Sequence, residues 1–116
     1  MYSVWSLAVG SLWLVWMCLV ACAEPIDGQK VFIESGCARC HELDGSGGSQ
    51  GPPLEALSTH WTPISLEQFL SDPPTYAKGD ARLQAYADDY MTPMPVLVIT
   101  SERRKALVQY LLEKYP

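Results

Sequence analysis

Basic side chains are scarce in this sequence. Its 116 residues include 8 lysines and arginines against 13 aspartates and glutamates, which gives a formal net charge of −5. Proteins that bind nucleic acid usually present a basic face to the phosphate backbone, so this balance argues against a nucleic-acid partner. An acidic chain can still dock electrostatically on a basic surface of another protein. The length allows one small domain.

Charged side chains are absent from the first 23 residues, which are mostly apolar. A helix of about 20 residues spans roughly 30 Å, the thickness of the hydrocarbon layer of a membrane. The segment has no polar face to meet water, which argues against a core helix of a soluble domain. We therefore expect residues 1–23 to be a signal or membrane anchor and residues 24–116 to form the domain.

Three fates of this apolar segment stay open. The run from Leu19 to Cys22 resembles a bacterial lipoprotein signal, in which Cys22 is acylated and membrane-tethered. The sequence Ala21-Cys22-Ala23 also resembles a cleavage site, which would release a soluble protein beginning at Glu24. Retention as an uncleaved anchor is the third. Each fate predicts an exported domain on the periplasmic side, membrane-tethered or soluble after cleavage.

Long runs of valine and isoleucine are also missing after residue 23, and the apolar residues there recur at helical spacing. We expect helices at about residues 28–35, 54–57, 65–71, 80–90 and 101–114. Asp27 is expected to cap the first helix and Thr100 or Ser101 the last. Pro73 and Pro74 should end the third helix.

Histidine is represented only by His41 and His60, and the place of His41 is the most informative feature of the chain. Residues 37–41 read Cys-Ala-Arg-Cys-His, which has the form C-x-x-C-H, the attachment sequence of c-type haem. The thiols of Cys37 and Cys40 can add across the two vinyl groups of a haem and form thioethers. His41 is then placed to donate an imidazole nitrogen to the iron as the proximal axial ligand.

Three other interpretations of this motif fit the sequence less well. A thioredoxin-like redox motif needs a βαβ pattern around it, and the shortage of strand-forming runs argues against one. A structural zinc site needs a second pair of ligands, and only His60 remains downstream. A disulfide between Cys37 and Cys40 explains neither the adjacent histidine nor the methionines downstream.

Two loops contain further candidate site residues. The glycine-rich stretch after His41 ends in Gly-Pro-Pro-Leu, and a rigid Pro52 can hold a carbonyl still for the second N–H of a ligating imidazole. In the sequence Met91-Thr92-Pro93-Met94-Pro95 the prolines forbid a regular helix, so a thioether is displayed from a constrained loop. Either methionine is a candidate sixth ligand for haem iron.

Near residue 60, two more side chains could contact a haem. His60 is an alternative axial ligand, although a lone histidine is more often a surface group. Trp61 could donate its indole N–H to a haem propionate, although core packing is the commoner role of a tryptophan.

From Asp27 to Tyr115 the sequence resembles a class I (mitochondrial-type) monohaem cytochrome c. The residues that carry the resemblance are the first helix with Phe32, the C-x-x-C-H motif, the Gly-Pro-x-Leu sequence at 51–54, Met94-Pro95, and a last helix containing Tyr110-Leu111. The resemblance implies an all-α fold of four to five short helices around one covalently attached haem c. It also implies that Pro52 offers its carbonyl to His41, and it favours Met94 over Met91 as the axial ligand.

The resemblance implies single-electron transfer between redox partners outside the cytoplasm. With both axial positions of the iron occupied, no substrate needs to reach the metal, so an electron carrier is expected rather than an enzyme. A haem-bearing, membrane-anchored subunit of a larger respiratory or dehydrogenase complex is the alternative. An enzyme or gas sensor requires an open or labile sixth position at the iron.

Overall fold

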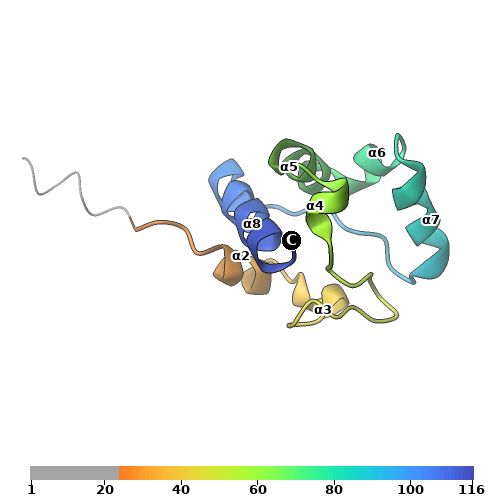
Figure 1. The fold of residues 1–116 in the computed structure, drawn as a ribbon, viewed down its shortest axis with the longest axis horizontal. Coiled ribbons are helices and arrows are strands. Elements are labelled where there is room, and N and C mark those ends of the chain that lie inside the picture. The colour runs from red at the N-terminus through yellow and green to blue at the C-terminus, as the bar shows by residue number, and fades with distance from the viewer. Residues whose placement is uncertain (1–23) are drawn as a thin grey trace, which may run out of the picture.

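A computed structural model describes residues 24–116, and within that range the chain is helical with no strand (Figure 1). The four longer helices are α2 (Gly28–Glu34), α5 (Pro63–Ser71), α7 (Ala81–Asp89) and α8 (Ser101–Lys114). The three short ones are α3 (Ala38–His41), α4 (Leu57–His60) and α6 (Pro73–Ala77). The predicted all-α fold is confirmed. The expected signal or anchor, residues 1–23, lies outside the described residues.

None of the helices from residue 24 onward is both long and apolar enough to cross a membrane.

Side-chain caps begin each of the longer helices, as the sequence predicts for two of them. The Asp27 carboxylate accepts hydrogen bonds from the backbone N–H groups of Gln29 and Lys30, and the Thr100 hydroxyl accepts one from Arg103 N–H at 3.2 Å. Each cap satisfies N–H groups that have no partner within the helix. The cap of the last helix is therefore Thr100 and not Ser101.

The helix expected at residues 54–57 is wrong. Ala56 has a left-handed φ of 48°, and α4 begins only at Leu57. The Leu54 N–H donates to the Gly45 carbonyl at 2.7 Å, and the Leu57 N–H donates to the Tyr115 carbonyl at 3.0 Å. Hydrogen bonds to distant parts of the chain thus replace those of a local helix.

Two short helices fall where the sequence predicts none. Asp72 follows the end of α5 and caps α6, because its carboxylate accepts from Thr75 N–H at 3.3 Å. The prolines that stop α5 occupy the first positions of α6, where a missing N–H costs nothing. The other unexpected helix, α3, is the haem motif itself.

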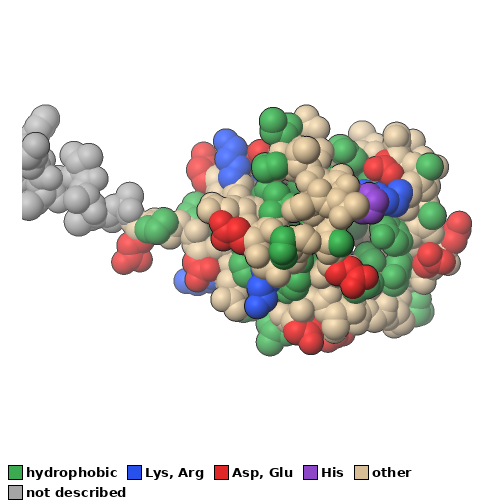
Figure 2. Space-filling view, in the orientation of Figure 1, with side chains coloured by type: hydrophobic (Ala, Val, Ile, Leu, Met, Phe, Trp, Pro, Cys, Tyr) green, Lys and Arg blue, Asp and Glu red, His purple; other side chains and the backbone are tan. Residues whose placement is uncertain are grey.

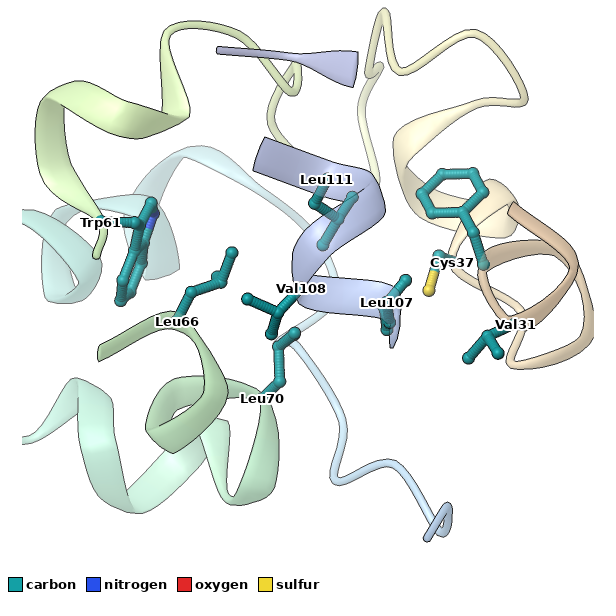
Figure 3. Close-up of a cluster of buried hydrophobic side chains, with 9 residues drawn as sticks. Val31, Cys37, Trp61, Leu66, Leu70, Leu107, Val108 and Leu111 are labelled. Carbon is teal, nitrogen blue, oxygen red and sulfur yellow. The ribbon is translucent and has the colours of Figure 1, made fainter. Parts of the chain in front are cut away.

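The core forms where α2 and α8 cross and α5 packs against α8 (Figure 3). Val31, Phe32 and Leu107 are at most 1 % exposed. Gly28 permits the close crossing, since a Cβ there would lie 2.3 Å from the Ala106 carbonyl oxygen and 2.5 Å from Tyr110 Cβ. The other buried side chains of this core cluster are Cys37, Trp61, Leu66, Leu70, Val108 and Leu111.

Helix α7 lies on the side of the molecule away from α2, and the segment from residue 91 to 100 runs back from it to α8 (Figure 1). None of the α7 side chains is buried. The fold therefore sets a densely packed pair, α2 and α8, opposite a lightly packed helix and an irregular loop.

Candidate functional site

His41 ends α3 and is held by a loop that follows it. Its ring Nδ1 lies 2.8 Å from the Pro52 carbonyl oxygen. A carbonyl can only accept, so Nδ1 carries the proton and Nε2 keeps its lone pair. Burial lowers the pKa of His41 and outweighs the opposite effect of the bond to Pro52, so the neutral imidazole is favoured. The expected hydrogen bond is present, and it leaves one nitrogen free to bind a metal.

The two cysteines of the motif lie one helical turn apart. Gly36 adopts a left-handed φ of 81° between α2 and the motif, and the Cys37 N–H donates to the Phe32 carbonyl at 3.2 Å. Cys37 is 9 % exposed, and burial raises the pKa of its thiol to about 11. Both thiols are free. The structure therefore has no disulfide between Cys37 and Cys40.

An open cavity brings together side chains from most of the described helices. Its space amounts to about 810 Å³ when the solvent at its mouth is counted. Cys37, His41, Pro52 and Met94 all line it. The other apolar lining residues are Phe32, Pro53, Leu54, Ala56, Leu57, Trp61, Leu66, Phe69, Leu70, Leu83, Tyr86, Leu107 and Leu111. The structure thus places Cys37, His41 and one of the two candidate methionines at one apolar site, whereas Cys40 is half-buried and does not line it.

The two methionines of the 91–95 loop have different surroundings. Met94 is half-buried and lines the cavity with His41. Met91 is 76 % exposed, and it is not among the residues that line that cavity. This geometry favours Met94 as a ligand to a metal held by His41.

Besides His41, the polar residues that line the cavity are a second histidine, an arginine and a glutamate. His60 is exposed at the end of α4, and the Arg82 guanidinium lies 5.0 Å from the centre of the Trp61 ring. Asp80 forms an ion pair with Arg82 at 3.8 Å. Glu55 also lines the cavity. Figure 2 shows a hollow on this face with a histidine and a basic side chain at its edge.

Trp61 belongs to the core instead of reaching into solvent. It packs against Phe69 and Tyr76, with ring centroids 4.9 and 5.7 Å away. Arg82 was not a candidate from the sequence, because a single arginine in a polar helix carries no local signal. Only the fold brings it over the tryptophan.

The family model described as Cytochrome c matches residues 26–114. The chain belongs to the cytochrome c family. No solved structure matches it. The match is to the family as a whole and covers nearly all of the described residues. This match indicates a haem-based electron-transfer protein of the c type rather than a catalytic enzyme.

The site of this cytochrome c fits the haem that the family carries. The cavity is predominantly apolar, as the porphyrin plate requires, and the C-x-x-C-H turn lies at its wall. The His41 imidazole is neutral and oriented, which is the form that binds iron. The thioether of Met94 is a soft ligand from the same cavity.

Proposed function

We propose that this cytochrome carries single electrons through one haem c, attached at Cys37 and Cys40 and ligated by His41 and Met94. The observation that carries the proposal is the shared cavity, which His41, held by Pro52, and Met94 both line. Bound there, the haem supplies an iron that cycles between two oxidation states. The protein would contribute the imidazole of His41 in a fixed orientation, the thioether of Met94 and an apolar wall.

The ligand assignment is tested by comparing Met94→Ala with Met91→Ala. A bond from methionine sulfur to ferric iron produces a weak charge-transfer absorbance band. We expect Met94→Ala to abolish the band and lower the reduction potential, since a thioether raises it relative to a weaker ligand. Met91→Ala should keep the band and change the reduction potential much less than Met94→Ala does. Loss of the band in Met91→Ala alone would refute the assignment.

We also propose that the redox partner presents a basic surface. Acidic side chains predominate from residue 42 to 89, the part of the chain that contains α4 to α7. They are Glu42, Asp44, Glu55, Glu67, Asp72, Asp80, Asp88 and Asp89, against Lys78 and Arg82 as the basic ones. The remaining charges are nearly balanced. Opposite charge on a partner increases the association rate, and salt reduces that effect.

The electrostatic attraction to a basic partner can be tested with small-molecule oxidants, so that the natural partner need not be known. A cationic and an anionic metal complex of similar driving force are reacted with the reduced protein over a range of salt concentrations. We expect the reaction with the cationic oxidant to slow as salt is added, and that with the anionic oxidant to accelerate. The opposite pattern would contradict the proposed basic partner.

The exported location is the last part of the proposal, and it depends on residues 1–23. The supporting observation is the uncharged apolar character of that segment. The intact mass of the native protein distinguishes a retained anchor, an acylated Cys22 and a chain starting at Glu24, because each leaves a different mass. Recovery of the unmodified full-length chain in a cytoplasmic fraction would contradict export.

A further inference from the structure

The loop before Pro52 and the loop before Met94 are joined by three contacts. The Met91 N–H donates to the Ser49 carbonyl at 3.2 Å. The Gln50 amide Nε2 lies 4.0 Å from the Met91 sulfur, and the Thr92 hydroxyl donates to Gln50 Oε1. Gln50 therefore uses both ends of its side-chain amide to hold two consecutive residues of the other loop. We call these four residues, Ser49, Gln50, Met91 and Thr92, the clasp.

One end of the clasp is fixed to the His41 side of the cavity. Two residues after Gln50, the Pro52 carbonyl accepts from His41. Between them, Gly51 lies so close to the motif that a Cβ there would be 3.2 Å from Cys40 Cβ. The Gly47 N–H also donates to the His41 carbonyl at 2.9 Å. Gln50 thus projects from a segment that packs directly against the C-x-x-C-H turn.

The other end of the clasp precedes Met94 by two residues. Pro93 and Pro95 restrict the backbone on either side of Met94, so anchoring residues 91 and 92 limits where its sulfur can lie. Within residues 24–116, no other hydrogen bond connects the stretch from 91 to 98 with a distant part of the chain. The clasp is thus the polar attachment of the methionine loop.

We propose that Gln50 is a positioning residue that couples the two ligand loops and holds Met94 in place in the cavity that His41 also lines. This inference rests on the proposed function, in which His41 and Met94 are the axial ligands. It also assigns a role to Met91, which anchors the loop from outside the cavity. Loosening the clasp increases the freedom of the Met94 sulfur and lets an external ligand replace it more readily.

The test is a titration of the haem-loaded ferric protein with imidazole, which competes with a methionine for iron. In Gln50→Leu, which keeps the bulk and loses both contacts, we expect apparent imidazole affinity to rise about fivefold to tenfold. The reduction potential should fall as well, because a less firmly held thioether favours the reduced iron less. Thr92→Val loses one contact and should give a smaller rise, of about threefold.

Two further variants separate positioning from general destabilisation. Gln50→Glu keeps an oxygen that accepts from Thr92, so its imidazole affinity should stay within about twofold of the parent. Gln109→Leu is the matched control, since Gln109 bonds Glu113 within α8 at 3.0 Å and does not line the cavity. Its titration and potential should equal those of the parent. Thr92→Val continues the test if Gln50→Leu does not fold.

The outcomes separate this inference from the proposed function. If the parent shows a sulfur-to-iron band that Met94→Ala abolishes, but Gln50→Leu and Thr92→Val titrate like Gln109→Leu, the positioning role is wrong and the ligand assignment stands. If the parent has no such band, the ligand assignment and the positioning role are both overturned.

Discussion

The two sides of the cavity are built differently. On one side α2 and α8 cross at Gly28 and bury Phe32 and Leu107 almost completely. On the other side α7 has no buried side chain, and residues 91–98 are attached through the clasp. The side that carries the C-x-x-C-H motif is therefore held by fully buried side chains, while the side that carries Met94 is held by partly buried ones and a few polar contacts. Met94, the ligand proposed on that side, is therefore the one that we expect local structure to release most easily.

The largest effect is expected from truncating the packed side. Leu107 is fully buried, so Leu107→Ala should lower the free energy of unfolding by about 2–5 kcal/mol, through lost burial and the cavity left behind. Denaturant unfolding of the haem-loaded protein measures it. Val98→Ala, at a fully exposed position of the 91–98 stretch, is the control and should change stability by less than about 0.5 kcal/mol. Equal losses at both positions would contradict the comparison.

Gly28→Ala tests how close the crossing is. The added methyl would overlap the Ala106 carbonyl oxygen and Tyr110 Cβ, so α2 and α8 must separate. We expect a loss of about 1–3 kcal/mol, although alanine is by itself the better helix former. Thermal unfolding measures the loss. Gly79→Ala is the matched control, since a Cβ there would lie 3.8 Å from its nearest neighbour, Tyr76 O. A stabilised Gly28→Ala protein would show that the helices are not in contact there.

Amide hydrogen exchange compares the two sides within one sample. Helix α8 has Leu107, Val108 and Leu111 buried, whereas α7 has no buried residue. We expect amides in the middle of α7 to exchange at least about tenfold faster than those in the middle of α8, since local opening there exposes less apolar surface. Exchange followed by mass spectrometry measures it. Equal protection would mean that the two sides open together.

The smallest effect is expected at an exposed ion pair of the packed side. The Arg103 guanidinium lies 2.6 Å from Glu34, and this hydrogen bond is the main reason that the pKa of Glu34 is lowered below 4.5. The folded state favours the ionised carboxylate, so the stabilisation is present above pH 4.5 and is lost as the pH falls through the lowered pKa.

Glu34→Gln should therefore reduce the denaturation midpoint slightly at neutral pH, and the difference from the parent should shrink below pH 4.5. The effect is small because both side chains are substantially exposed. Glu24→Gln, outside the helices, is the control and should leave the midpoint unchanged at neutral pH. A difference that grows as the pH falls would contradict the role of Glu34.

Much of the helical structure follows from local signals. The caps at Asp27 and Thr100 and the stop at Pro73 are encoded within a few residues, so the sequence predicts α2, α5, α7 and α8 to within one or two residues at most ends. The expected helix at 54–57 fails because its backbone bonds with Gly45 and Tyr115, which are distant in sequence. No local pattern contains such partners.

By itself, the sequence determined the chemistry of the site. The C-x-x-C-H spacing specifies haem attachment because two thiols and an imidazole must fall on one helical turn, and the prolines around Met94 forbid a helix there. The tertiary structure decided which groups meet. It brought the Pro52 carbonyl to His41, lined the cavity with Met94 while leaving Met91 exposed, and joined the two loops through Gln50. The physical reason is that spacing along the chain controls neighbours within a turn, whereas contacts across tens of residues depend on how the helices pack.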